Sequence, residues 1–457
     1  MAKLHEKAEA AYNKKIEPLV ARVQPRPHRQ SPESGKSRRY VVGEYGQRDI
    51  VPGTYREYET DYTGERRSCF FDTQSGLVGV AGTDHDLLIE MVRRIADDRI
   101  YRGALSEDFV YEQSIRWLRS RVEKPEGDHP TWTDFIEDAA SEAVSRFEVW
   151  LPIPLVRITG PFQIGRTVFR PITQSMIDGW AQGLSNQASS RGEAYLERLR
   201  SRIQGATAAC VEVEAEPIHA NEIALRESGA SVAILSLACP SMINPYEWAP
   251  LVPSSLDRQG ASLVLHVKDS TVARHQEALH KGIRREWVLK TEEIEEHLRG
   301  VWGFGHNLIV VRRNEFQDIL LGALVHYSKS VLKRDMGERL LYVITALESL
   351  FIRGSGESIV QNLSERMALL TGSNVTERLE MSNVISKVYD FRSGFVHRGS
   401  PAFDMSVLQA FFLYAGRTMW FVLANHNRWK RKADFLNTID THKFAGPQFS
   451  TVGIPSI

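Results

Sequence analysis

Apolar residues recur at helical spacing through the last third of the chain. Between residues 315 and 430 they mark five helical segments, joined by short breaks such as Arg353–Gly356. Short breaks between long helices with one apolar face favour antiparallel packing, so we expect an all-α helical bundle. The predicted segments are Phe316–Lys333, Glu338–Phe351, Glu357–Leu370, Thr376–His397 and Asp404–Lys430.

Residues 76–310 combine helical and strand-like patterns, which predicts an α+β region. The alternation Val211-Glu212-Val213-Glu214 is typical of a half-exposed strand. Short β-branched runs within Val149–Thr173 are interrupted by four prolines, which favours edge strands and turns over a central sheet. Gly303–His306 is rich enough in glycine to predict a hinge before the bundle. Helical spacing begins near Asp84, Asp108, Trp132 and Asn221.

The expected fold class is a multidomain α+β protein, with an N-terminal α+β region followed by the C-terminal helical bundle. Residues 1–75 predict an opening helix and then irregular chain, in which Gln30–Arg39 is a solvated linker or an RNA-contacting arm. Residues 76–310 form a sensor or regulatory region, residues 311–440 form the bundle, and residues 441–457 form a tail.

Composition adds few constraints. The 57 basic and 57 acidic residues cancel, so any affinity for nucleic acid must come from local patches. Three scattered cysteines and an N-terminus without an apolar core predict a cytoplasmic protein. The apolar run Val407–Ala424 contains Arg417, which favours a buried bundle helix over a membrane span.

The stretch Tyr389–Gly399 carries two polar residues that the helical spacing of the apolar residues does not explain. Arg392 and His397 are five positions apart, about 140° around a helix, where each can meet groups from a second element. Gly399 predicts a helix end, which places His397 in the last turn. A histidine can move protons near neutral pH, and an arginine fits phosphate oxygens, so this pair suits phosphodiester chemistry.

These residues occur in a series of motifs that resembles the HEPN superfamily, and within it the Apea-like HEPN group. The likeness covers about residues 315–430, and the motifs are Arg339–Leu341, Ala346–Leu350, Ser364–Leu370 and Tyr389–His397. The resemblance implies a dimer in which Arg392 and His397 lie near the same residues of the second copy across a two-fold axis. Together these residues would cut RNA without metal or cofactor. It also implies an effector of bacterial anti-phage defence, with abortive infection as the outcome.

Ser393 departs from the family pattern, in which Asn, Asp or His often follows the arginine. This departure favours an alternative, a non-catalytic HEPN module that binds a nucleotide or RNA and dimerises. In either case we expect a homodimer through the bundle, with a phage-derived or nucleotide trigger acting at residues 76–310.

Other polar groups carry secondary hypotheses. Glu348 and Arg366 interrupt apolar helices and predict an ion pair with each other inside the bundle, in a supporting role beside Tyr389 and Ser393. The triplet Asp84-His85-Asp86 has no partner ligands at metal spacing and predicts capping and surface roles.

Two further patterns concern phosphate binding. The cluster Arg428–Lys432 predicts compensation of a helix dipole at the end of the last segment, or a contact with the RNA backbone. No standard phosphate-binding loop occurs in the sequence.

Overall fold

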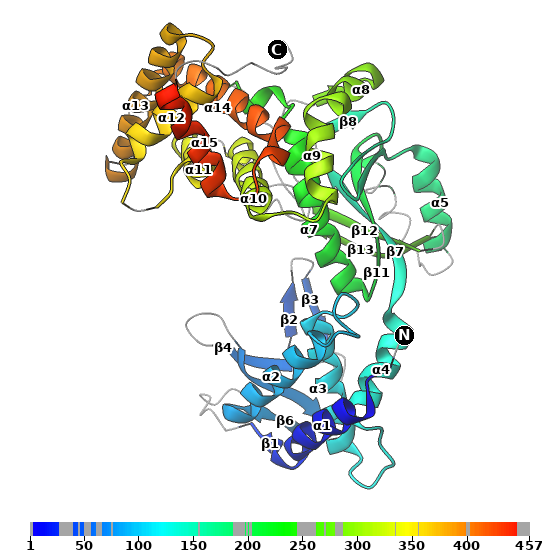
Figure 1. Cartoon of the computed structure of the whole chain (residues 1–457). Helices are drawn as coiled ribbons and strands as arrows, with labels where there is room; N and C mark the ends of the chain where they lie inside the picture. The colour runs from blue at the N-terminus through cyan, green and yellow to red at the C-terminus, as the bar shows by residue number, and fades with distance from the viewer. Residues whose placement is uncertain are drawn as a thin grey trace. The chain divides into compact units, whose positions relative to one another are not determined.

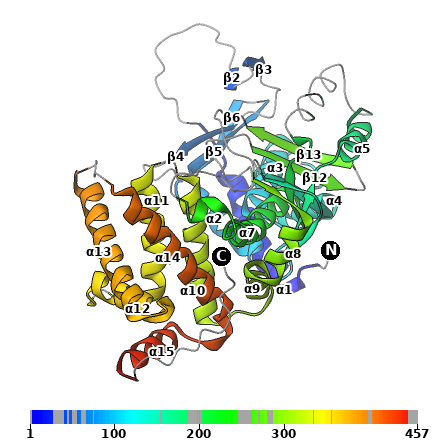
Figure 2. The same cartoon turned by 90° about the horizontal axis from the view of Figure 1, so that it is seen from above.

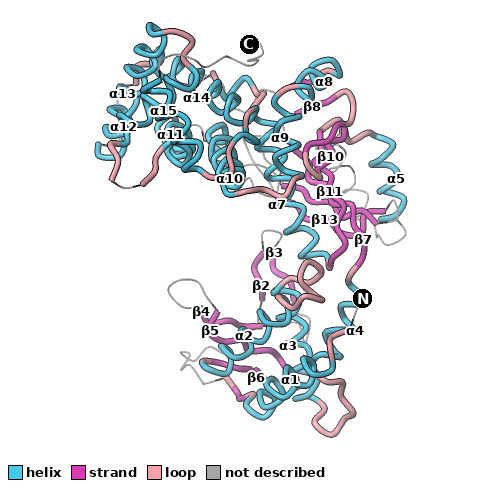
Figure 3. Tube along the Cα trace, viewed as in Figure 1, coloured by secondary structure: helices cyan, strands magenta, loops and turns pink. Residues whose placement is uncertain are grey.

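The chain folds into two compact units that both contain helices and strands (Figures 1 and 3). Unit 1 comprises Met1–Phe147 and Glu214–Ala220, and unit 2 comprises Glu148–Val213 and Asn221–Ile457. The structure is a computed structural model that describes residues 3–26, 40–43, 46–49, 56–60, 66–74, 76–153, 156–185, 197, 200, 203–244, 262–268, 271–278, 287–333, 335–354, 356–398 and 403–445.

Unit 1 is built on a four-stranded sheet with the strand order β1-β6-β5-β4, whose three pairings are all antiparallel. The apolar stripe that begins near Asp84 forms α2, and Leu88, Met91 and Ile95 from this stripe are fully buried. The elements of the unit are α1 (Glu6–Ile16), η1 (Glu17–Arg22), β1 (Gln24–Pro25), β2 (Tyr40–Gly43), β3 (Gly46–Asp49), β4 (Arg56–Thr60), β5 (Arg66–Thr73), β6 (Gly76–Ala81), α2 (Thr83–Ala96), α3 (Glu107–Glu123) and α4 (Trp132–Ala143).

The separate stretch Glu214–Ala220 joins unit 1 through a buried carboxylate. The Ser106 hydroxyl donates to Glu216 at 2.6 Å, and the backbone N–H groups of Ile218 and His219 donate to it at 2.7 Å each. A single side chain therefore connects the start of α3 to the start of α7 (Pro217–Ser236).

The observed units do not coincide with the boundaries expected near residues 75 and 310. Residue 75 lies between β5 and β6, which pair from Thr73↔Gly76 to Ser68↔Ala81, so the predicted irregular chain before residue 75 contains sheet strands. The opening helix is present as α1, and the predicted linker Gln30–Arg39 lies outside the described residues.

Unit 2 contains a six-stranded sheet with the order β13-β12-β7-β11-β10-β9. The prediction that the proline-rich stretch forms edge strands is wrong for β7, which lies inside this sheet. Its Pro152 follows the three residues paired with β12, Glu148 to Trp150, so the missing N–H interrupts none of those pairs. The strands are β7 (Ser145–Ile153), β9 (Phe162–Ile164), β10 (Thr167–Pro171), β11 (Thr207–Ala215), β12 (Ser262–Lys268) and β13 (Thr271–Ala278).

The glycines expected to form a hinge instead lie inside a helix, α9. A Cβ atom on Gly305 would lie 2.2 Å from Ile234 of α7, so glycine here permits close packing of two helices rather than bending. Beside these helices lie α5 (Gln174–Ser185), η2 (Pro240–Met242), α8 (Thr291–Arg299), α9 (Val301–Val310) and the parallel pair β8 (Val156–Ile158) and β14 (Trp287–Leu289).

A C-terminal helical region completes unit 2, and most of its helices run side by side (Figure 2). Consecutive helices pack on one another from α10 to α14, and α15 packs on α10 and α12. Asn314, Asp335 and Asp404 cap the first turns of α10, α11 and α14 by accepting backbone N–H groups. The region contains α10 (Glu315–Lys329), η3 (Ser330–Leu332), α11 (Met336–Phe351), α12 (Ile359–Thr371), α13 (Val375–Arg398), α14 (Met405–Ala424), η4 (His426–Arg428) and α15 (Lys432–Ala445).

The last predicted segment, Asp404–Lys430, contains α14, which ends earlier than expected, and a further helix follows the segment. α14 ends at Ala424, and α15 continues to Ala445, into the stretch expected to be a tail. Within the described residues, α14 alone is long and apolar enough to cross a membrane, and 61% of its most apolar window is buried inside the structure. Arg417 of this helix pairs with Glu377 of α13 at 2.5 Å.

A buried guanidinium ties α12 to α15, and its partners correct the predicted Glu348–Arg366 pair. The Arg366 side chain donates to Glu357 at 2.9 Å, to Asp440 at 3.0 Å and to the carbonyl of Phe351 at 2.6 Å. Glu348 is not among its partners, because the loop before α12 and the distant helix α15 supply the two carboxylates.

These bonds shift the ionisation of both carboxylates in the same direction. Hydrogen bonds from Arg366 lower the pKa of Glu357 below its usual value. Burial acts to raise the pKa of Asp440, but hydrogen bonds from Arg366 and Arg353 outweigh it and lower that pKa as well. Both carboxylates therefore stabilise the folded state while they are ionised.

Replacing this arginine should destabilise the protein strongly. We expect Arg366→Met to lower the free energy of unfolding by about 3 kcal/mol, because two partly buried carboxylates lose their cation. Lys443→Met is the matched control, because it removes a more exposed ion pair with Glu365 and should cost less than about 1 kcal/mol. Urea denaturation measures both variants.

The pH dependence gives a second measurement of the same interaction. Glu357 and Asp440 contribute stability that is fully present above their unfolded pKa values of about 4, and it is lost as the pH falls through their lower folded values. This acid loss should be shallower in Arg366→Met than in the wild type. An equally steep loss in both proteins would contradict the assignment.

Candidate active site

α13 carries the predicted reactive residues, and its start is well defined. Asn374 accepts the N–H of Glu377 at 2.9 Å, which ends the preceding turn and begins the helix. Met381, Ile385 and Val388 are fully buried along its inner face. The helix continues to Arg398, so Arg392 and His397 belong to one rigid element, with backbone positions separated along the axis by roughly 7.5 Å.

Arg392 is half-buried, and one of its guanidinium nitrogens lacks a hydrogen-bond partner among the described residues. Its guanidinium carbon lies 5.8 Å from the centre of the Tyr389 ring, one turn earlier on α13. Its Nε is buried and has no hydrogen-bond partner among the described residues. No carboxylate among the described residues forms an ion pair with Arg392. Arg366, in contrast, is paired with two carboxylates. A desolvated donor of this kind suits an anionic ligand.

Tyr389 is fixed by Glu348. The sequence had predicted Arg366, not Tyr389, as the partner of this glutamate. The Tyr389 hydroxyl donates to Glu348 Oε1 at 2.8 Å across α11 and α13. Burial, followed by the neighbouring Glu348 charge, raises the pKa of Tyr389, so the phenol stays protonated. The pair therefore holds the ring against which Arg392 lies.

The last turn of α13 is held by a residue that sequence reasoning missed. A Cβ atom on Gly337 of α11 would lie 2.3 Å from the Phe395 ring, so only glycine lets α11 approach this closely. The sequence signal was a glycine at the start of a helical pattern, which by itself does not identify its neighbour. This contact positions the helix turn between Arg392 and His397.

The remaining site residues separate into three cases. Ser393 is exposed on α13, in reach of solvent. The side chain of His397 and the predicted cap Gly399 lie outside the described residues. Arg366 belongs to the interaction with Glu357 and Asp440 and is not part of this site.

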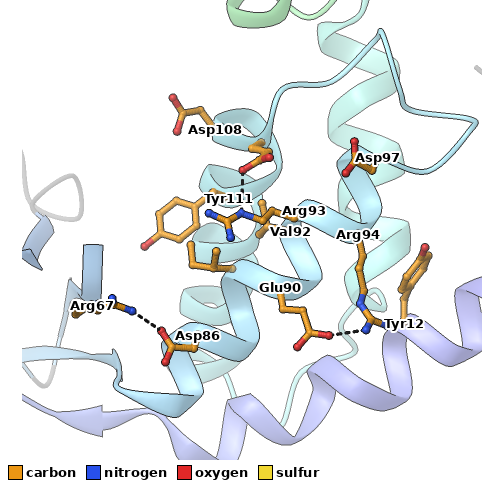
Figure 4. Close-up of a pocket in the computed structure, with 12 residues that line it drawn as sticks. Tyr12, Arg67, Asp86, Glu90, Val92, Arg93, Arg94, Asp97, Asp108 and Tyr111 are labelled. Carbon is orange, nitrogen blue, oxygen red and sulfur yellow. Dashed lines mark ion pairs between the residues drawn. The ribbon is translucent and has the colours of Figure 1, made fainter. Parts of the chain in front are cut away.

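A cavity of about 780 Å³ lies in unit 1, between side chains of α1, β5, α2 and α3 (Figure 4). Its arginines are already paired with acids, so it offers an anion no free cation. The pairs are Arg67–Asp86 at 3.6 Å, Arg94–Glu90 at 2.6 Å and Arg93–Glu107 at 3.5 Å.

Within the triplet beside this cavity, only His85 differs from the predicted surface role. His85 is fully buried, with Nε2 3.1 Å from the Tyr111 hydroxyl, and Gly82, outside the triplet, occupies the N-cap position of α2. Asp84 pairs with Arg22 and Asp86 with Arg67. Across the described residues, no group of three or more His, Cys, Asp and Glu side chains is arranged to hold a metal ion.

Comparison with known proteins gives no match among family models, curated proteins or solved structures.

Removing the Tyr389 hydroxyl should destabilise the site locally. We expect Tyr389→Phe to cost about 1 to 2 kcal/mol of unfolding free energy, since Glu348 loses a donor in a partly buried position. Glu348→Gln should cost less, because its amide oxygen still accepts the hydroxyl. Tyr342→Phe on α11 removes a hydroxyl without a described hydrogen bond and serves as the control. Equal melting temperatures for both phenylalanine variants would contradict the assignment.

Proposed function

We propose that the protein is a metal-independent RNA endonuclease of the HEPN type, with Arg392 and His397 as its catalytic residues. The observation that carries the proposal is the state of Arg392, which is partly desolvated, held against Tyr389 and not neutralised by a described carboxylate. An arginine in this state is suited to bind a phosphate bidentately. The motif resemblance supplies the reaction class.

The proposed chemistry uses the nucleophile that RNA carries. A base removes the proton of the 2′-hydroxyl, whose oxygen attacks the adjacent phosphorus and forms a 2′,3′-cyclic phosphate. The bond to the 5′-oxygen breaks, and an acid protonates that leaving oxygen. His397 from each of two copies supplies the base and the acid, and the Arg392 guanidinium stabilises the charge on the crowded phosphorane.

The outer face of α13 supports a homodimer. The proposed chemistry requires a dimer because two copies of His397 supply the base and the acid. Val375, Leu379 and Val396 are exposed by 69%, 68% and 56%, although all three are apolar. Eighteen residues separate Leu379 from position 397, which is five full helical turns, so both positions lie on the same side of α13. A two-fold axis that runs alongside α13 would make the two copies of this helix parallel and would bring the two copies of position 397 together.

Ser393 favours a second candidate function. It is exposed beside Arg392 and replaces the amide, acid or imidazole that is common after the motif arginine. A non-catalytic module would use the same Arg392 to bind a nucleotide or RNA phosphate, and it would keep the same dimer contact.

The setting that fits either function is the cytoplasm of a bacterium under phage attack. RNA cleavage there would stop the infected cell, as expected of an abortive-infection effector. The region 76–310 would then receive the trigger, whether a phage component or a nucleotide.

The nuclease proposal predicts a specific pair of variants. We expect His397→Ala to abolish cleavage of a fluorescent RNA in EDTA with little loss of stability, since a histidine in a terminal turn contributes at most about 1 to 2 kcal/mol. Arg392→Lys should reduce cleavage by about 100-fold or more, because an ammonium keeps the charge but loses the planar fork.

Two measurements decide between the candidate functions. Melting curves recorded with the cleavage assay separate loss of chemistry from loss of fold. Retained cleavage by a folded His397→Ala dimer would exclude the nuclease mechanism. Absence of cleavage in the wild type, together with RNA binding that depends on Arg392, would favour the non-catalytic module.

The dimer proposal predicts that charge on the outer face of α13 separates the copies. We expect Val375→Glu/Leu379→Glu to be monomeric by light scattering at micromolar concentration and to lose cleavage. Acidic residues near a helix N-terminus suit its dipole, so the helix itself should persist.

Val310→Glu/Val311→Glu is the control for added surface charge, because these residues are also half-exposed valines but lie outside α13. It should remain dimeric and active. A fully active α13 variant that is monomeric would show that one chain holds a complete site.

A further inference from the structure

Two segments distant in sequence meet at one end of the C-terminal helical region. The backbone N–H of Phe316 donates to the carbonyl of Lys430 at 3.1 Å, and the Asn314 side-chain amide donates to the carbonyl of Trp429 at 3.3 Å. Gln317 donates to Asn427 at 2.9 Å. The stretch before α10 and the stretch between α14 and α15 therefore form one continuous surface.

This surface has an excess of positive charge, although the whole chain is neutral. Residues 311–318 and 426–434 together contain six basic and three acidic side chains. Two of the acids are engaged, because Asp318 pairs with Arg313 at 2.7 Å and Asp434 accepts the backbone N–H of Arg431 at 3.1 Å. Glu315 is the third acid, and it is exposed at the start of α10.

Four of the basic side chains define what we call the basic surface. All four are exposed, and none forms an ion pair with a described residue. They come from both segments and are Arg312, Arg428, Lys430 and Arg431.

The fold does not need these charges for its own stability. α14 ends at Ala424 and α15 begins at Lys432, so Arg431 and Lys432 lie at a helix N-terminus, where the dipole disfavours cations. The dipole compensation that the sequence suggested applies to the end of a long helix, but α14 ends four residues before Arg428, which ends only the short 3₁₀ helix η4. The helix dipole therefore does not account for the cations at Arg431 and Lys432.

The aromatic residue within the cluster has a structural role. Trp429 is buried, with its ring centre 5.5 Å from Phe316 and 4.9 Å from Phe435, and its indole N–H donates to Thr438 at 3.2 Å. It anchors the segment and cannot stack on a base. Its neighbours Arg428 and Lys430 are thus presented on a fixed backbone.

We propose that the basic surface is a binding site for the phosphate backbone of single-stranded RNA, separate from Arg392 and His397. The choice of RNA rests on the proposed function. Exposed cations without an accessible aromatic ring match a repeating anion rather than a base, so binding should be independent of base identity and sensitive to salt. The surface would hold a long substrate while the α13 site acts on one bond.

The test measures binding without cleavage, in the full-length protein. The probe is a fluorescein-labelled 30-nucleotide oligouridylate with 2′-O-methyl groups, which lacks the nucleophile for strand cleavage. Fluorescence anisotropy is recorded from 50 to 300 mM salt. We expect Arg312→Ala/Arg428→Ala/Lys430→Ala/Arg431→Ala to bind at least about tenfold more weakly and to reduce the slope of log K against log salt by about 3.

The control removes two cations elsewhere in unit 2. Arg226→Ala/Lys329→Ala changes two exposed residues without a described ion pair, and Lys329 lies at the opposite end of α10, roughly 20 Å away. This control should bind the probe as the wild type does, and all proteins should melt at similar temperatures.

Three results would overturn the proposal. The fourfold variant could keep the affinity and salt slope of the wild type, or the control could lose as much affinity as the fourfold variant. The variant could also lose binding to vesicles containing phosphatidylserine while its RNA binding stays unchanged. The probe cannot be cleaved, so the binding result can be interpreted even if the protein shows no nuclease activity. If the variants show that the basic surface does not bind RNA, the proposal fails even when the protein cleaves RNA.

Discussion

The hydrogen bonds of the Arg366 guanidinium are the constraint on which the C-terminal helical region depends. One buried charge is satisfied by Glu357 before α12, Asp440 in α15 and the last carbonyl of α11. A buried charge is costly unless its donors are paired, so these bonds favour the arrangement in which the three elements meet. Helical pattern alone would allow several arrangements of amphipathic helices, and this set of bonds selects among them.

Arg392 shows the opposite use of the same side chain. It lies in the same helical region and is also partly desolvated, but its fold supplies an aromatic ring and leaves Nε without a described partner. The contrast separates an arginine whose donors are all bonded within the fold from one whose Nε has no described partner. Glu348 fixes Tyr389, against which this second arginine lies, and the close approach at Gly337 fixes Phe395 in the next turn of α13.

Sequence reasoning succeeded where the information was local. The helical spacing of apolar residues in Thr376–His397 predicted α13, in which Val384 and Val388 are buried. It failed where distant residues decided the outcome. Asp440 is 74 positions from Arg366, and no periodicity indicates that they meet. Glycines at 303 and 305 resembled a hinge because the pattern could not show Ile234, the neighbour that requires a small residue. Pro152 suggested an edge strand because the local sequence does not show which residues of β7 pair with β12.

The composition of unit 1 limits how this protein could have been assembled by recombination of genes. Its residues come from two separate stretches, and Glu216 in the second stretch is the acceptor for Ser106 in the first. A fusion event that moved residues 1–147 as one block would leave that carboxylate behind. Unit 1 therefore cannot be obtained by a single cut in the sequence, because a fragment of residues 1–147 would lack Glu216.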